Sequence, residues 1–172
     1  DKPLVKLSLP MLSDRAAWDA YHDAAAAELI SILRSGRSVA FLTLGDPSIY
    51  STYLYLHRRV RAAGLDAQMI PGVPSFCAAA AAMGEGLAEG GVPLHIVPAS
   101  YEGLDEALGW RGVKVLMKTG HFFPAVRESL RHAGVLDKTT LITRCGMSGE
   151  QVTDALDSVE HAGYFSLFVV RE

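Results

Sequence analysis

The sequence predicts an α/β protein, and three observations lead to that class. Strand-like apolar runs alternate with segments of helical periodicity along the 172 residues. The run from Val39 to Leu44 is almost wholly apolar, and the turn Gly45-Asp46-Pro47 separates it from a helical segment. Apolar residues make up 49% of the chain and charged residues 20%, a composition typical of a globular protein with a buried core.

Charge and cysteine content limit the partners and the cellular compartment that we expect. The net charge of −3 gives no general attraction to nucleic acid or to an anionic membrane. No apolar run approaches the roughly 20 residues that a membrane-spanning helix needs. The two cysteines, Cys77 and Cys145, lie far apart, and the first ten residues do not resemble a secretory signal. We therefore expect a reduced, cytoplasmic protein.

The first half of the chain predicts helices and strands in alternation. A short extended segment over residues 3–11 precedes a helix from Ser13 to Gly36, whose apolar side chains form one stripe that we expect to lie on a sheet: Trp18, Tyr21, Ala25, Leu29, Ile32 and Leu33. A strand buried on both faces is expected over residues 39–44. A helix capped by Ser51 or Thr52, a strand over residues 65–70 and a helix from Ser75 to Gly84 follow.

The second half continues the alternation. Strands are expected over residues 92–97, 113–118, 140–144 and 165–170, and helices over residues 101–108, 124–133 and 151–161. The short helix at residues 101–108 marks a boundary. We therefore expect two α/β domains, over residues 1–98 and 99–172.

Four turns rich in glycine or proline follow the expected strands, near Asp46, Gly72, Gly120 and Gly146. Glycine lets a ligand approach the backbone closely, so these turns suit a nucleoside-like ligand held largely by main chain. Asp46 either caps its own turn or accepts hydrogen bonds from that ligand. The motifs of phosphate-binding loops, dinucleotide sites and serine hydrolases are absent, and the six histidines lack metal-ligand spacing.

Three basic side chains follow the expected strands of the second half. Lys118 and Arg144 close two strands, and His121 stands in the turn after the first of them. They either bind the carboxylates of a ligand or are ordinary solvated residues at strand ends.

Four motifs, taken in order, resemble those of the tetrapyrrole methylases, the class III S-adenosylmethionine-dependent methyltransferases. The motifs are FLTLGDPSIYSTYLYL, PGVPSF, VLMKTG and RCG. The resemblance covers nearly the whole chain and implies two α/β domains, with S-adenosylmethionine (product S-adenosyl-L-homocysteine) in the cleft between them. It also implies a homodimer.

Carried over by position, the resemblance implies a set of cofactor-binding residues: Gly45, Asp46, Ile49, Pro74, Ser75, Met117, Lys118 and Gly146. The family generally has Thr or Ser where this chain has Pro74. Since proline has neither a hydroxyl nor an N–H group, we expect Ser75 to take over that contact.

The resemblance further implies methyl transfer to carbon 20 of precorrin-2, or of its cobalt-bearing counterpart, in corrin biosynthesis. Lys118, His121 and Arg144 then bind the carboxylates of this tetrapyrrole substrate, and no metal or catalytic base is identified. The alternatives are another corrin intermediate as substrate, or a truncated binder of a tetrapyrrole or nucleoside. Family members open with a strand and a Gly-x-Gly-Pro-Gly-Asp loop, which we expect to be omitted from this sequence.

Overall fold

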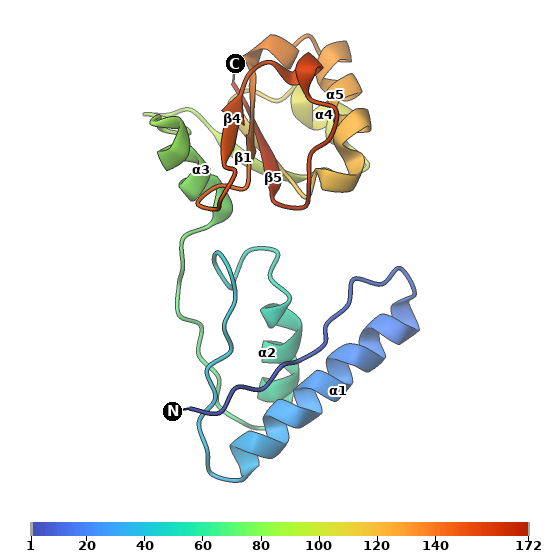
Figure 1. Cartoon of the computed structure of the whole chain (residues 1–172), viewed down its shortest axis with the longest axis vertical. Helices are drawn as coiled ribbons and strands as arrows, with labels where there is room; N and C mark the ends of the chain where they lie inside the picture. The colour runs from blue at the N-terminus through green and yellow to red at the C-terminus, as the bar shows by residue number, and fades with distance from the viewer. Residues whose placement is uncertain (1, 172) are drawn as a thin grey trace. The chain divides into compact units, whose positions relative to one another are not determined.

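The computed structural model describes residues 2–171, which form two compact units (Figure 1). One unit ends at Pro74 and the other begins at Ser75. Helix α3 (Ser75–Met83) and strand β1 (Leu94–Pro98), which we expected in the first domain, therefore group with the second unit.

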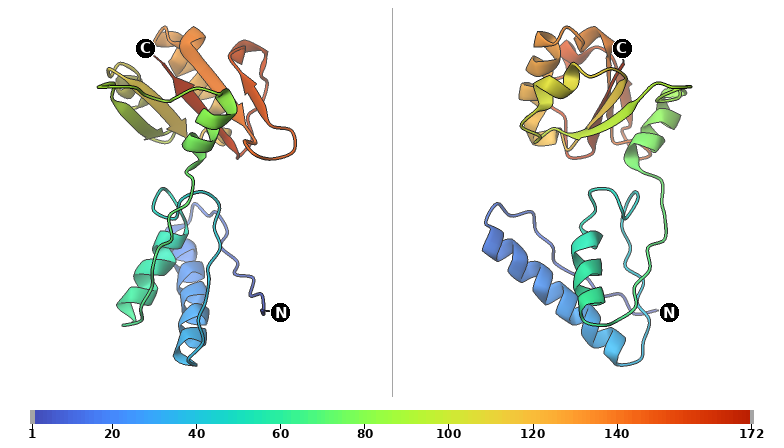
Figure 2. Two further views of the ribbon diagram at one scale, coloured as in Figure 1. Left: turned by 90° about the vertical axis from the view of Figure 1, so that its left-hand side faces the viewer. Right: turned by 180° about the vertical axis from the view of Figure 1, so that it is seen from behind.

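The first unit is built on two helices, α1 (Arg15–Arg34) and α2 (Tyr53–Ala62), which lie side by side (Figure 2). The Asp14 carboxylate caps α1 by accepting a hydrogen bond from Ala17 N at 2.7 Å. The core between the helices consists of small and branched apolar side chains: Ala25, Ala26, Leu29, Leu56 and Val60. Both helices were predicted, because their signals are local in sequence.

The buried stripe of α1 differs from the prediction: His22 and Ala26 are buried, and Tyr21 is not. Tyr21 is 44% exposed, whereas His22 is buried and stacks on the Trp18 ring at 3.8 Å between centroids. His22 Nδ1 donates to the Trp18 carbonyl oxygen at 2.7 Å. The stripe packs on α2 rather than on a sheet, and Arg59 of α2 pairs with Asp23 of α1 at 2.6 Å.

The two strands expected in the first unit are absent. Residues 39–44 and 65–70 have no regular secondary structure, and Leu42 and Ile70 are 84% and 75% exposed. Among the described residues, no backbone–backbone hydrogen bond involves residues 37–45. The prediction of a strand buried on both faces was wrong because an apolar run becomes a strand only where a neighbouring strand pairs with it.

The second unit contains a five-stranded mixed sheet in the order β1-β2-β5-β3-β4. Its other strands are β2 (Val113–Met117), β3 (Thr139–Thr143), β4 (Gln151–Thr153) and β5 (Ser166–Val170). β1 and β2 are parallel, whereas β5 lies between β2 and β3 and runs antiparallel to both. β4 is antiparallel to β3.

Helices α4 (Leu104–Leu108) and α5 (Phe123–His132) cover one face of this sheet (Figures 1 and 2). The core between sheet and helices is almost fully buried and includes Leu108, Leu116, Val126, Leu130, Leu141 and Phe168. The Phe123 and Phe168 rings stack at 5.8 Å between centroids. Three short 3-10 turns complete the unit: η1 (Gly120–Phe122), η2 (Leu136–Lys138) and η3 (Leu156–Ser158).

Residues 151–161 were predicted to be helical in part, but only the 3-10 turn at residues 156–158 is helical. Gln151 to Thr153 form β4, which pairs with β3 through Thr143 and Leu141, and a 3-10 turn follows. The chain reverses within residues 144–150, and the β-branched Val152 and Thr153 favour pairing with the preceding strand over a helix.

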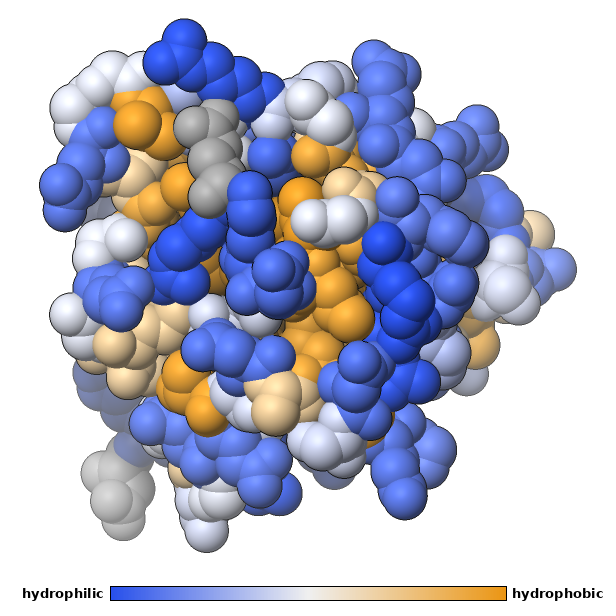
Figure 3. Space-filling view, turned by 90° about the horizontal axis from the view of Figure 1, so that it is seen from above, coloured by the Kyte–Doolittle hydropathy of each residue, from blue (hydrophilic) through white to orange (hydrophobic). Residues whose placement is uncertain are grey.

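The face in Figure 3 is mainly hydrophilic, with apolar residues exposed in several places, among them an area near its centre. Within residues 2–171, no helix has the length and apolar character that crossing a membrane requires.

Candidate functional site

The Asp46 carboxylate ties two turns of the first unit together. Oδ1 accepts hydrogen bonds from the backbone N–H and the hydroxyl of Ser48, at 2.8 and 2.5 Å. Oδ2 accepts from Gly72 N at 3.0 Å. The structure therefore brings the Gly45-Asp46-Pro47 turn against the Pro71-Gly72-Val73-Pro74 turn, and Asp46 does cap its own turn.

These hydrogen bonds stabilise the ionised form of Asp46. The Ser48 hydroxyl, then the backbone N–H groups of Gly72 and Ser48, lower the pKa of the Asp46 carboxyl below its ordinary value. A carboxylate oxygen accepts two hydrogen bonds, so Oδ2 retains a position for a further donor. The capping role and the ligand-binding role predicted for Asp46 are therefore compatible.

The two turns are in direct backbone contact. A Cβ atom on Gly72 would lie 2.2 Å from the Gly45 carbonyl oxygen. Gly45 itself has a φ of 77°, a conformation that side chains other than glycine rarely adopt. Ile49 N lies 3.4 Å from the Asp46 carbonyl oxygen, so Ile49 belongs to the same turn.

The remaining predicted residues of this region stand at the junction of the units. Pro74 ends the first unit, and Ser75 is the first residue of α3 in the second. Their proposed contacts with a cofactor stay predictions.

In the second unit, the carboxyl ends of β2 and β3 and the amino end of β5 lie at the same end of the sheet. Met117 is the last residue of β2, and Lys118 follows it; Arg144 follows β3. Since β5 lies between β2 and β3, the backbones of Lys118 and Arg144 are about 10 Å apart. The structure thus brings these predicted residues together at what we call the β2/β3 end.

Both basic residues have unusual backbone conformations. Lys118 has a φ of 58° and Arg144 a φ of 52°. Non-glycine residues in this region cost about 1–2 kcal/mol each, and such residues cluster at functional sites. The Arg144 side chain lies close to Gly149, where a Cβ would meet Arg144 Cζ at 3.7 Å.

The loops at the β2/β3 end are fixed by short contacts. Thr119 Oγ1 donates to the Ser166 carbonyl oxygen at 3.2 Å. The first residue of η1, Gly120, packs closely on Gly163, since a Cβ on Gly120 would lie 2.7 Å from Gly163 O. η1 also contains the exposed His121. Gly146 N donates to Glu150 Oε2 at 2.6 Å.

Two of the predicted cofactor contacts have occupied main-chain groups. The Met117 carbonyl oxygen accepts from Ala99 N at 2.7 Å, and Gly146 N donates to Glu150. Gly146 nevertheless has open space, since no atom lies within 4 Å of a Cβ built on it. A ligand can approach the Gly146 backbone closely without displacing a side chain.

Cys145 adjoins this loop and is half-buried. Burial, then the charge and hydrogen bond of Glu150, raise the pKa of its thiol above the ordinary value. Cys145 is therefore held as a neutral thiol, which is a poor nucleophile and a poor metal ligand. Among residues 2–171, no group of three or more His, Cys, Asp or Glu side chains is arranged to hold a metal ion.

Sequence reasoning missed two aromatic residues at the β2/β3 end. Tyr164 is 67% exposed and Phe165 47% exposed, and their rings form an edge-to-face pair at 5.1 Å. Phe165 was predicted to be the first residue of the last strand, but β5 begins one residue later. The sequence signal that could have found them is Gly163, which is followed by the two aromatic residues and then by the strand.

A cavity of about 340 Å³ lies at the opposite end of the sheet, lined by residues of α5, η2 and η3. Two of its three acidic groups are engaged: Asp154 accepts from the Thr140 hydroxyl and Asp157 pairs with Arg131, both at 2.6 Å. This cavity contains none of the predicted site residues.

The geometry defines a class of protein: a mixed α/β protein whose glycine-marked turns and strand ends carry a carboxylate and basic side chains. The family profile of the tetrapyrrole (corrin/porphyrin) methylases matches residues 4–159. The chain therefore belongs to the tetrapyrrole methylase family.

Curated relatives fall within corrin biosynthesis. The chain is 35% identical to the cobalamin biosynthesis protein CobIJ of Mycobacterium bovis, over 88% of this chain and 30% of that protein. It is 30% identical to precorrin-2 C(20)-methyltransferase of Sinorhizobium sp, over 87% and 62%, and 30% identical to cobalt-precorrin-2 C(20)-methyltransferase of Salmonella typhimurium, over 95% and 70%. The chain thus spans less than two thirds of the first two relatives.

Solved structures share the fold. The cobalamin biosynthetic enzyme cobalt precorrin-4 methyltransferase superposes with a TM-score of 0.72 at 17% identity, over 85% of this chain and 69% of that chain. Uroporphyrin-III-C-methyltransferase of Thermus thermophilus gives 0.69 at 26% identity, over 87% and 70%. Another structure of that Thermus enzyme, in complex with S-adenosyl homocysteine, gives 0.62 at 19% identity, over 90% and 73%.

Proposed function

We propose that this chain is part of an S-adenosylmethionine-dependent methyltransferase that methylates carbon 20 of precorrin-2 or of its cobalt-bearing counterpart. The observation that carries the proposal is the similarity to two enzymes of that specificity, at 30% identity over 87% and 95% of the chain. The family match over residues 4–159 supports the same reaction class.

S-adenosylmethionine supplies a methyl group on a positively charged sulfur, and the reaction is an in-line displacement. Such a reaction depends mainly on holding the two reactants in line and on excluding water. A strong protein nucleophile is not needed, because the ring carbons of precorrin-2 are electron-rich. The neutral Cys145 thiol at the β2/β3 end is consistent with a site that positions its reactants and does not attack them.

The residues of the first unit fit a cofactor with hydroxyl and ammonium donors. Asp46 is ionised, has a free acceptor position on Oδ2 and is fixed in place by Ser48 and Gly72. Gly45, Asp46 and Ile49 would hold the cofactor from this turn. In the second unit, Gly146 offers an open backbone approach.

A second candidate is methylation of another corrin intermediate. The chain is 38% identical to precorrin-4 C(11)-methyltransferase of Rhodococcus erythropolis, although over only 63% of its length. The shorter coverage makes this the weaker candidate.

The test is incubation of the protein with S-adenosylmethionine and either precorrin-2 or precorrin-4. We expect mass spectrometry to show one added methyl group on precorrin-2, and NMR to place it on carbon 20. Methylation of precorrin-4 alone would favour the second candidate. Binding of S-adenosylhomocysteine without methylation of either substrate would favour a non-catalytic binder.

Isothermal titration with S-adenosylhomocysteine tests the cofactor site separately. We expect Asp46→Asn to weaken binding, because the neutral amide is a poorer acceptor. Asp66→Asn is the matched control, since Asp66 is a carboxylate of the same unit that pairs with Arg61 at 2.7 Å. Equal affinity of the two variants would count against the Asp46 site.

A further inference from the structure

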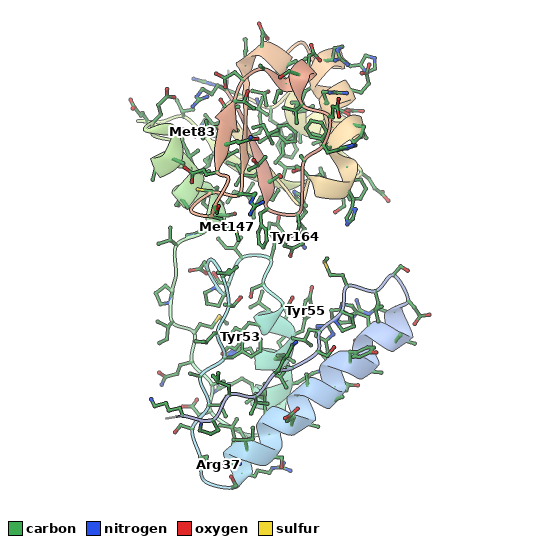
Figure 4. All side chains as sticks on the ribbon, viewed as in Figure 1. Arg37, Tyr53, Tyr55, Met83, Met147 and Tyr164 are labelled. Atoms are coloured by element: carbon green, nitrogen blue, oxygen red, sulfur yellow. The ribbon has the colours of Figure 1, made fainter. Side chains whose placement is uncertain are left out.

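An exposed apolar surface adjoins the basic residues at the β2/β3 end. It consists of Tyr164, Phe165 and Met147, whose exposed fractions are 67%, 47% and 41%. Figure 4 shows Met147 and Tyr164 at the same end of the second unit. Exposed apolar groups gathered in this way mark binding sites more often than singly scattered ones do.

Backbone hydrogen bonds link the segments that carry these three residues. Arg144 N donates to the Phe165 carbonyl oxygen at 2.7 Å, and Met147 N donates to the Arg144 carbonyl oxygen at 2.8 Å. The Tyr164 and Phe165 rings meet edge to face at 5.1 Å, with planes 87° apart. The apolar surface is therefore preorganised, so a ligand need not order it on binding.

Two positively charged side chains, Arg144 and Lys118, belong to this end of the sheet. Arg144 lies between Phe165 and Met147 in the hydrogen-bonded chain, and Lys118 and the η1 residue His121 follow the neighbouring strand. Glu150 is the nearby acid, and its carboxylate accepts the Gly146 N–H. An aromatic surface bordered by cations is complementary to a flat, conjugated ring that carries carboxylates at its rim.

We propose that Tyr164, Phe165 and Met147 form the surface on which the tetrapyrrole macrocycle rests, while Arg144 and Lys118 bind its peripheral carboxylates. This rests on the proposed function for the class of substrate. It adds specificity-determining residues that contact the ring itself. Lys118 and Arg144 both have positive φ values and stand at the strand ends that border the aromatic pair, and such conformations are concentrated at functional sites.

The test measures binding of uroporphyrin III, a stable conjugated macrocycle with carboxylate side chains, by its absorbance and fluorescence. We expect Tyr164→Ala and Phe165→Ala each to weaken porphyrin binding about tenfold, the loss typical of removing one aromatic stacking partner. Affinity for S-adenosylhomocysteine should stay unchanged. Tyr21→Ala is the matched control, because Tyr21 is a tyrosine of α1 that is 44% exposed.

The charges are tested with Arg144→Gln. We expect this variant to weaken binding of uroporphyrin III but not of its methyl ester, and to reduce the dependence of affinity on salt. Equal effects on the free acid and on the ester would overturn the assigned role of Arg144.

Other outcomes would overturn the aromatic surface. Loss of S-adenosylhomocysteine affinity in Tyr164→Ala would make the pair a cofactor contact, and a change in molecular mass by light scattering would make it a contact between chains. Unchanged porphyrin affinity in both aromatic variants, or no porphyrin binding by the parent protein, would end the proposal. This binding experiment does not depend on methylation of precorrin-2. A failure of the proposed function can therefore be distinguished from a failure of this proposal.

Discussion

The contact between Gly72 and Gly45 makes Gly72→Ala an informative change. The added Cβ would lie 2.2 Å from Gly45 O and 3.1 Å from the carbonyl carbon of the same residue. Both atoms belong to the backbone, so the two turns must separate by roughly 1 Å to restore an ordinary contact. Overpacking of this kind costs about 1–3 kcal/mol.

This separation also acts on Asp46. The hydrogen bond from Gly72 N to Asp46 Oδ2, at 3.0 Å, crosses the same gap and lengthens when the turns part. We therefore expect Gly72→Ala to lower the unfolding temperature of the first unit, by about 4–8 °C for each kcal/mol of unfolding free energy that is lost. We also expect it to weaken S-adenosylhomocysteine binding.

The assay follows Trp18 fluorescence in a Trp110→Phe background. The chain has two tryptophans, and Trp18 is the one in the first unit, so this background reports unfolding of that unit alone. Gly91→Ala, in the second unit, serves as the unperturbed reference, because no atom lies within 4 Å of its Cβ position. A Gly72→Ala protein as stable as Gly91→Ala would refute the turn contact.

Three further predictions concern acid stability, the core and the thiol. Because the pKa of Asp46 is lowered in the folded protein, the carboxylate stabilises the fold above its ordinary pKa, and this stabilisation is lost as the pH falls below about 4. Asp46→Asn should therefore reduce the loss of stability at acid pH. An unchanged acid side of the pH–stability curve would contradict this. Phe168→Ala should destabilise the second unit by about 3–5 kcal/mol in urea unfolding, because Phe168 is fully buried against Phe123, and a loss under 1 kcal/mol would count against that packing. Glu150→Gln should lower the pKa of Cys145 and speed its alkylation in a Cys77→Ser background, while burial keeps that pKa above the ordinary value; an unaltered rate–pH profile would exclude the Glu150 interaction.

The second unit was predictable from sequence where the signals were local. The apolar runs at 113–118, 140–144 and 165–170 became β2, β3 and β5 within a residue or so at each end. The order of strands was not predictable, because β5 inserts between β2 and β3 through contacts far apart in sequence.

The first unit shows the limit of the same reasoning. Helices α1 and α2 were predicted since their hydrogen bonds lie within the segment. The run at 39–44 has the composition of a buried strand, but composition does not supply the neighbouring strand, and Leu44 is 80% exposed.

The residues of the candidate site were likewise predictable only in part. Asp46, Lys118 and Arg144 could be proposed as site residues because turns and strand ends are visible in sequence. Tyr164 and Phe165 were missed because their exposure depends on where β5 begins, and this is set by the pairing of Ser166 with Thr143.

The central place of β5 constrains how the protein is made. β1 with β2, and β3 with β4, can form pairs early in synthesis, but the two pairs share no hydrogen bonds until residues 166–170 emerge from the ribosome. Until then, the inner sides of β2 and β3 are open to wrong partners. Folding of the second unit is thus completed only after β5 has been translated.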